Sequence, residues 1–182
     1  MLFRSARETA ARVACGAVCR RLLAEFGVAI GSHVVELGGI KAPEIESLPA
    51  SLNEVADRSP VRCLDDAAST RMVQAIEEVI NARDTLGGIA EVVVSGLPVG
   101  LGAHVSWDRR LDGRLARAMM SIQAVKGVEI GLGFDAARQR GSQVHDEIVP
   151  GGSRLTGGYA RRSNRAGGLE GGMTTGEPVR SE

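Results

Sequence analysis

The chain has 182 residues, of which 43% are hydrophobic and 3% aromatic, and its formal net charge is zero. This length suits one domain or a large part of one, with a core built from aliphatic side chains. The zero net charge argues against a nucleic-acid-binding surface, and no apolar run approaches the about 20 residues that span a bilayer, so we predict neither a nucleic-acid nor a membrane partner.

The N-terminal third of the chain predicts a helix, a strand and a loop. Ser5-Ala6-Arg7-Glu8 has the pattern of a capping box at a helix start, and Gly27 is placed as the C′ residue at its end. Apolar residues recur at helical spacing between them, and Val28–Leu37 follows as a strand closed by two glycines. Proline residues punctuate a predicted loop at 41–59.

The middle of the chain repeats this alternation. We predict helices at 65–82 and 111–122, strands at 88–95 and 125–132, and a loop or irregular strand at 96–107. From Gly141 onward the regular pattern disappears, and 150–166 is predicted to be a mobile surface loop. The elements together indicate a mixed α/β (α+β) architecture.

Cysteine and arginine usage narrows the class of protein. Cys15, Cys19 and Cys63 do not form a disulfide framework, and no further cysteine or histidine completes a metal site near the first two, so we predict no metal. No leader-like apolar run follows the N-terminus, which favours a cytoplasmic protein. Arginine supplies 20 of the 22 basic residues, which suits contacts to phosphate or carboxylate groups and equally fits a coding bias.

The segment from Met119 to Phe134 carries the most information. A predicted helix runs into a predicted strand that three glycines interrupt, and Gln123 and Lys126 lie at the joint. Glycines at this density let the backbone pass close to a flat or phosphorylated ligand, although close packing of a strand on a helix would explain them as well. Lys126 fits a contact to phosphate or a surface ion pair with Glu129.

Motifs spread along almost the whole chain, from Arg4 to Pro178, belong together. They are Ser5-Ala6-Arg7-Glu8-Thr9-Ala10-Ala11-Arg12-Val13, Gly31-Ser32-His33-Val34, Pro60-Val61-Arg62-Cys63, Asp84-Thr85-Leu86-Gly87-Gly88, Gly96-Leu97-Pro98-Val99-Gly100-Leu101-Gly102, the segment from Met119 to Phe134, Gly141-Ser142-Gln143-Val144-His145-Asp146 and Asn164-Arg165-Ala166-Gly167-Gly168-Leu169-Glu170-Gly171-Gly172-Met173. In wording and in order, these segments resemble the chorismate synthases.

The resemblance implies a fold and an activity. The family has a β-α-β sandwich with helices held between two antiparallel sheets, and residues 1–182 resemble the central portion of that single domain. Its members are cytoplasmic homotetrameric lyases of the shikimate pathway of aromatic amino acid biosynthesis. They eliminate phosphate from 5-enolpyruvylshikimate 3-phosphate with anti-1,4 geometry to give chorismate. The reaction requires reduced FMN (FMNH2) without net redox change, and some members reduce their FMN with NADPH.

The resemblance also assigns site residues one by one. Ser5 lies in an FMN-contacting segment and Arg7 faces the anionic groups of the substrate, while a simple N-cap and a solvated arginine remain the alternatives. Gln123 and Ala124 match the flavin-contacting dipeptide, where an amide bonds the ring edge and a small side chain leaves room. Gly171 matches a glycine that approaches the flavin, and the alternative for its loop is a flexible linker.

The chain also departs from the family. His33, His104 and His145 match neither catalytic histidine of the family, so we assign no catalytic residue and predict structural or surface roles for all three. Phe3 stands where an FMN-contacting arginine is expected. The flanking segments of the family are not found, so we expect this chain alone to be inactive and to fold poorly. The competing interpretation is a non-catalytic module that binds flavin or assembles with other subunits.

Overall fold

The computed structural model describes residues 2–45, 47–154 and 156–182, and the side chains of residues 2–5 lie outside this description. The chain divides into two compact units, the first formed by Met1–Ile30 and Val94–Ser181 and the second by Gly31–Val93 with Glu182. Strands β1 (Ala29–Leu37) and β3 (Gly88–Ser95) cross the boundary between them.

The remaining elements belong to one unit each. The first unit contains α1 (Leu2–Glu25), η1 (Trp107–Arg109), α4 (Leu111–Met120), η2 (Gly133–Arg138), α5 (Gly141–Val144), β4 (Ile148–Pro150), β5 (Tyr159–Arg161), β6 (Leu169–Glu170), β7 (Met173–Thr174) and β8 (Val179–Ser181). The second contains β2 (Ile40–Lys41), α2 (Leu52–Ala56) and α3 (Asp66–Ala82). The predictions at 28–37, 65–82, 88–95 and 111–122 are confirmed to within two residues, whereas α2 was predicted as loop.

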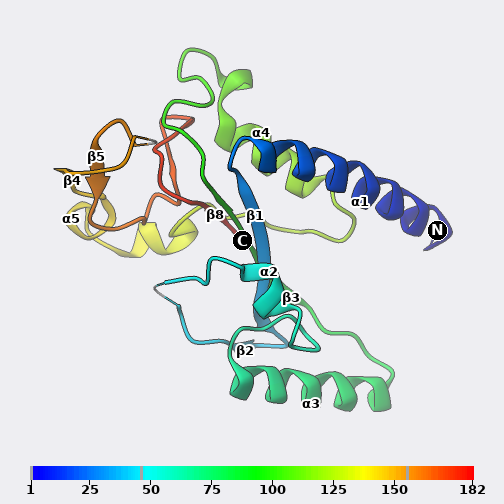
Figure 1. Ribbon diagram of the computed structural model, residues 1–182. Helices are drawn as coiled ribbons and strands as arrows, with labels where there is room; N and C mark the ends of the chain where they lie inside the picture. The colour runs from blue at the N-terminus through cyan, green and yellow to red at the C-terminus, as the bar shows by residue number, and fades with distance from the viewer. Residues whose placement is uncertain (1, 46, 155) are drawn as a thin grey trace. The chain divides into compact units, whose positions relative to one another are not determined.

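The long strands β1 and β3 lie side by side in a four-stranded sheet of order β2–β1–β3–β8 (Figure 1). A Cβ on Gly88 would lie 2.8 Å from the carbonyl oxygen of Glu36, and one on Gly96 would lie 2.2 Å from that of Gly27. The start of β3 thus lies beside the end of β1, and the end of β3 lies beside the start of β1, so the two strands run antiparallel. The pairs β4–β5 and β6–β7 form separate two-stranded antiparallel sheets.

A two-residue turn of Gly38 and Gly39 joins β1 to β2, since Leu37 pairs with Ile40 directly beyond it. The φ angles of the two glycines are +59° and +77°. Positive φ at both central residues defines the type I′ geometry that matches the twist of a hairpin. The glycines therefore serve the turn, as the predicted end of the strand at Leu37 indicated.

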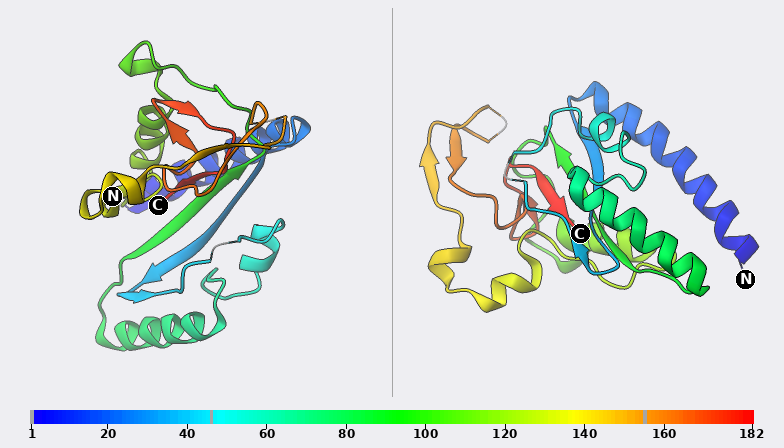
Figure 2. Two further views of the ribbon diagram at one scale, coloured as in Figure 1. Left: turned by 90° about the vertical axis from the view of Figure 1, so that its left-hand side faces the viewer. Right: turned by 90° about the horizontal axis from the view of Figure 1, so that it is seen from below.

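Helix α3 supplies the core of the second unit and lies beside β2 (Figure 2). Asp65 caps it, accepting a hydrogen bond from the Ala68 N–H at 2.6 Å, which satisfies one of the free donors of the first turn. Ala68 and Met72 are fully buried on its inner face and cluster with buried Cys63. The partly buried side chains packed against this cluster are those of Val34, Leu37, Ile40, Ala42 and Val61.

Helix α1 ends as its sequence predicts but begins earlier. Gly27 has φ +78°, and the N–H groups of Gly27 and Val28 donate to Ala24 and Leu23 in the Schellman pattern. The N-cap predicted at Ser5 is wrong, because α1 starts at Leu2 and no helix breaker separates the two positions. The apolar side chains of α1 are exposed over its described length, up to 71% at Val18, and Phe26 just beyond it is 74% exposed.

The strand predicted at 125–132 is wrong. Only Ile130 forms an antiparallel bridge, with Ser181. The next residue, Gly131, lies so close to a glycine-rich loop that a Cβ would stand 2.2 Å from the Arg165 carbonyl oxygen and 2.5 Å from the Gly167 nitrogen. The glycines of this segment thus serve close backbone packing rather than a ladder of strand hydrogen bonds.

The predicted loop at 150–166 contains the end of a hairpin. Val149 pairs with Ala160 and Pro150 with Tyr159 in the β4–β5 sheet. The mobility of the segment stays a prediction. Helices beside antiparallel sheets confirm the α+β class, and no helix within the described ranges is long and apolar enough to cross a membrane.

Candidate functional site

The predicted site residues all fall in the first unit. Arg7 is exposed in the second turn of α1, and its side chain has no hydrogen bond or ion pair within the described part of the chain. Ser5 lies in the first turn, but its side chain is outside the description. Because α1 begins at Leu2, the backbone N–H of Arg7 is beyond the four free donors, and the helix-terminus argument for anion binding does not reach it.

Gln123 and Ala124 form a strained, exposed turn directly after α4. The Val125 N–H donates to the Ile122 carbonyl at 3.3 Å and closes the turn. Ala124 has φ +71°, in the left-handed region that residues with a Cβ rarely adopt, at an expense of about 1–3 kcal/mol. Such strain persists where the surroundings enforce it, and it concentrates at binding sites.

This turn meets helix α1. The Thr9 hydroxyl donates to Gln123 Oε1 at 3.5 Å, and Arg12 Nη1 donates to Ser121 Oγ at 2.8 Å. Glu8 holds the same guanidinium, with Nη2 to Oε1 at 2.9 Å. Thr9 and Arg12 were not predicted from the sequence as neighbours of the dipeptide. Their spacing of four and seven residues from Ser5 places all three on one helical face, and this pattern could have identified them.

Gly171 lies at the tip of the β6–β7 hairpin. Glu170 pairs with Met173, so Gly171 and Gly172 form a two-residue turn, with φ angles of +58° and +83°. This is again type I′ geometry, for which two glycines are suited. No atom lies within 4 Å of the place where a Cβ on Gly171 would be. The backbone of Gly171 is therefore open to approach from outside the chain.

The glycine-rich segment around this hairpin is not a flexible linker, and that alternative is wrong. Thr174 is 2% exposed, and its hydroxyl donates to the Pro98 carbonyl at 2.6 Å and accepts from the Leu101 N–H at 2.9 Å. The Thr175 N–H donates to the Gly168 carbonyl at 3.0 Å. Side-chain and backbone bonds thus tie both arms of the hairpin.

The two parts of the predicted site lie at opposite ends of α4. The Leu111 N–H, at the start of α4, donates to the Gly172 carbonyl at 2.8 Å. Gln123 follows the end of the same helix, whose 10 residues rise about 15 Å. The structure thus brings Gln123 to α1 but does not place Gly171 in contact with it.

A charge pair stands beside the hairpin turn. A Cβ on Gly172 would lie 2.6 Å from Arg110 Cγ, and Arg110 Nε donates to Asp112 Oδ1 at 3.1 Å. The hydrogen bond from Arg110 lowers the pKa of Asp112 below its usual range, although partial burial opposes this effect. The same bond and the carboxylate charge raise the pKa of Arg110.

One of the three histidines is buried and two are exposed. His33 is buried in the second unit, where its Nε2 lies 2.7 Å from Glu91 Oε2, and this pair crosses between β1 and β3. His104 and His145 are exposed. The described part of the chain contains no group of three or more His, Cys, Asp or Glu side chains arranged to hold a metal.

Lys126 does not form the ion pair with Glu129 that the sequence allowed, as judged from the residues described. Glu129 Oε2 instead accepts a hydrogen bond from the Phe134 N–H at 3.0 Å. The contact of Lys126 with a phosphate group stays a prediction.

Comparison with known proteins gives consistent matches. Residues 3–182 match the sequence model of the family described as chorismate synthase. Chorismate synthase 1 of Bacillus cereus (strain ATCC 10987) is 53% identical over 176 residues, and chorismate synthase of Brevibacillus brevis is 58% identical over 175 residues. Each match covers 96% of this chain and 44% of the relative, so the chain spans less than half the length of these relatives.

A solved structure described as a crystal structure of chorismate synthase also matches. Its TM-score is 0.88 at 49% sequence identity, and the match covers 98% of this chain and 55% of the other. The agreement extends over both compact units, and it confirms the predicted fold at the level of family architecture.

Proposed function

The chain belongs to the chorismate synthase family, and we propose that the protein acts in the family's reaction, the anti-1,4-elimination of phosphate from 5-enolpyruvylshikimate 3-phosphate to form chorismate. One observation carries the proposal beyond the match itself. Helix α1, which contains Ser5, is joined to the turn that carries Gln123 by the Thr9–Gln123 hydrogen bond at 3.5 Å and the Arg12–Ser121 hydrogen bond at 2.8 Å. The resemblance assigns both Ser5 and Gln123 to the flavin.

The described residues fit a flat ring system. Ala124 offers a small, exposed side chain on a strained turn, and the exposed Gln123 side chain carries an amide that can bond a ring edge. Gly171 leaves its backbone open where a Cβ would be. We propose that these three residues and Ser5 hold reduced FMN, which supplies the electron chemistry for an elimination without net redox change.

Arg7 is the proposed substrate contact. Its guanidinium is exposed and has no partner in the part of the chain that the structure describes, so its donors are available. A planar guanidinium suits bidentate contacts to a phosphate or carboxylate group, and the substrate carries both. The proposal extends, by family resemblance, to NADPH as a reductant of the flavin, to a homotetramer and to the cytoplasm.

An anaerobic binding and turnover experiment tests the proposal. FMN is titrated into the protein under reducing conditions, and chorismate formation from 5-enolpyruvylshikimate 3-phosphate is then followed by absorbance. Binding with turnover supports the enzyme. Turnover would also refute the expectation that this chain alone is inactive. Saturable FMN binding without turnover fits both that expectation and the flavin-binding module, whereas the absence of both binding and turnover would refute a flavin site. Gln123→Ala and Arg7→Ala separate the roles, because the first should weaken FMN binding and the second should raise KM for the substrate.

A further inference from the structure

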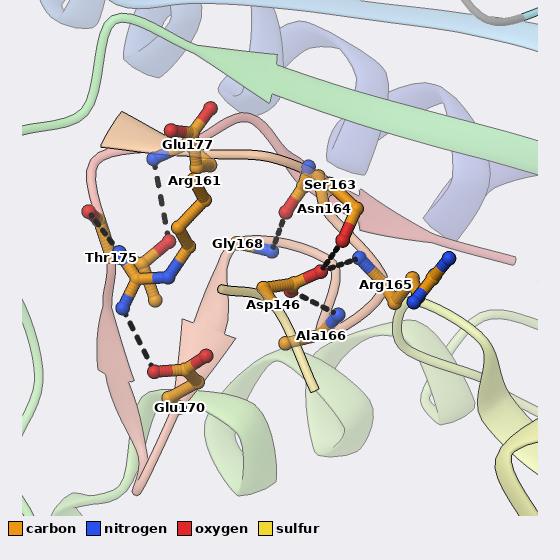
Figure 3. A network of polar contacts seen from close by, with 10 residues as sticks. All are labelled: Asp146, Arg161, Ser163, Asn164, Arg165, Ala166, Gly168, Glu170, Thr175 and Glu177. Atoms are coloured by element: carbon orange, nitrogen blue, oxygen red, sulfur yellow. Dashed lines mark hydrogen bonds and ion pairs between the residues drawn. The ribbon is translucent and has the colours of Figure 1, made fainter. Parts of the chain in front are cut away.

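Asp146 is a buried acidic residue (8% exposed) whose contacts the proposed reaction does not use. Three donors converge on its carboxyl group (Figure 3): Ser163 Oγ at 2.5 Å and the Arg165 N–H at 2.8 Å on Oδ1, and the Ala166 N–H at 2.9 Å on Oδ2. Burying a carboxyl group is unfavourable unless its oxygens accept hydrogen bonds. These contacts therefore hold Asp146 and residues 163–166, which follow β5, in one arrangement.

Asn164 extends this arrangement to both ends of the glycine-rich loop. Its Oδ1 accepts from the Gly168 N–H at 2.7 Å, and its Nδ2 donates to the Pro178 carbonyl at 2.7 Å. A Cβ on Gly168, which has φ +73°, would lie 2.5 Å from the Pro178 carbonyl oxygen. Backbone this close leaves no room for a side chain at position 168, and the two ends of the loop meet here.

Arg161 connects the fixed base to the hairpin that carries Gly171. Its side chain is 12% exposed, Nη2 donates to Glu170 Oε2 at 2.9 Å, and Nη1 donates to the Thr175 carbonyl at 3.3 Å (Figure 3). Its Nε is the one buried side-chain nitrogen or oxygen without a partner within the described residues. The guanidinium therefore bonds residues before and after the turn, Glu170 and Thr175, and leaves its Nε donor unsatisfied.

We propose that Asp146 is a positioning residue for flavin binding: it fixes residues 163–166, so that Asn164 closes the base of the loop at 163–178 and the hairpin presents the backbone of Gly171. This inference rests on the proposed function, because the flavin contact of Gly171 is itself a proposal. Asp146 acts through Ser163, Arg165 and Ala166 and is not a catalytic residue.

The test replaces Asp146 by asparagine in the intact protein. The amide keeps the shape of the side chain but turns one acceptor oxygen into a donor that faces another donor, so at least one of the three bonds is lost. We expect the Kd for FMN to rise about tenfold and the visible circular dichroism of the bound flavin to change. Hydrogen exchange should accelerate at residues 165–173 and not elsewhere. The matched control is Asp135→Asn, an exposed ion-pair partner of Arg138 in the same unit, which should change none of these.

The outcomes separate the two proposals. If the wild type binds FMN and Asp146→Asn binds it equally well, the inference is overturned, and equal acceleration of exchange throughout the first unit also overturns it by showing a general structural role. If the wild type does not bind FMN, the proposed function fails, and local exchange at 165–173 alone decides whether Asp146 fixes the loop. Should Asp146→Asn fail to fold, Ser163→Ala removes one donor and must give a smaller change in the same direction.

Discussion

Replacing Gly171 by asparagine tests whether a flavin approaches the hairpin turn, because the change adds a side chain while keeping the turn. Gly171 and Gly172 have φ angles of +58° and +83°, and asparagine followed by glycine is a preferred pair for a type I′ turn. No atom of the chain lies within 4 Å of the new Cβ, so the substitution creates no clash at that atom.

The expected effect on folding is small and the expected effect on binding is larger. Left-handed backbone is unfavourable by about 1–2 kcal/mol for an ordinary residue, and asparagine tolerates it better, so we expect a loss of less than about 1 kcal/mol. For a chain of this size that loss lowers Tm by less than about 4 °C. A side chain in the space that the flavin would fill should raise Kd by about 10- to 100-fold, equal to about 1.4–2.8 kcal/mol.

The assay measures Kd from a titration of FMN fluorescence and Tm from circular dichroism on the same samples. Gly39→Asn is the matched control, because Gly39 has φ +77°, lies in the Gly-Gly turn between β1 and β2, and also has no atom within 4 Å of the place where its Cβ would be. Because Gly39 is the second residue of its turn, asparagine there follows a glycine instead of preceding one, so the control should lower Tm by at least as much and leave Kd unchanged. A Gly171→Asn protein that stays folded like the control and binds FMN with the wild-type Kd would show that the flavin does not approach the hairpin turn.

Three further predictions concern stability. Met72→Ala should lower the free energy of unfolding by about 2–5 kcal/mol in urea titrations, because Met72 is fully buried, and a loss below about 1 kcal/mol would contradict its place in the core. His33→Ala should lower it by about 3 kcal/mol, since Glu91 loses a buried bond of 2.7 Å, whereas Glu91→Gln keeps an acceptor oxygen and should lose less. The Arg110 hydrogen bond lowers the pKa of Asp112, so the pair stabilises the folded state fully above the ordinary aspartate pKa of 3.8, and this stabilisation is lost as pH falls through the lower folded-state pKa. The Tm difference between wild type and Asp112→Asn should therefore vanish toward strongly acidic pH. A Tm difference that stays constant with pH would contradict the lowered pKa.

Local sequence patterns predicted those elements that near neighbours in the chain determine. The strand at Gly88–Ser95 follows from its β-branched side chains, and Asp65 was recognisable as the start of α3 because its side chain bonds a residue three positions on. The helix start predicted from the capping box at Ser5 is wrong, although it also rests on a local pattern. The residues before Ser5 favour a helix as well, and α1 begins at Leu2.

Contacts between distant segments were less accessible to prediction. Periodicity at 125–132 indicated a strand, but the backbone there is held by the loop near Arg165, some 35 positions later in the chain, and only Ile130 forms a bridge. At the predicted site, family resemblance named Gln123 and Ala124, yet the left-handed φ of Ala124 results from the surrounding packing and has no signature in its own side chain. Residue identity thus pointed to the dipeptide, while its strain required the structure.

The glycine-rich C-terminal region shows why composition alone misjudged a loop. Thirteen of the 24 glycines lie between Gly127 and Gly176, a density that suits a flexible linker as well as a tight cradle. What separates the two is the presence of buried polar side chains with bonds to the loop backbone, and Asp146, Asn164 and Thr174 supply them. Glycine lets the backbone come close, and these side chains then select one of the many paths that glycine allows. A glycine-rich segment interspersed with Asp, Asn and Thr should therefore be considered as a folded loop before it is interpreted as a linker.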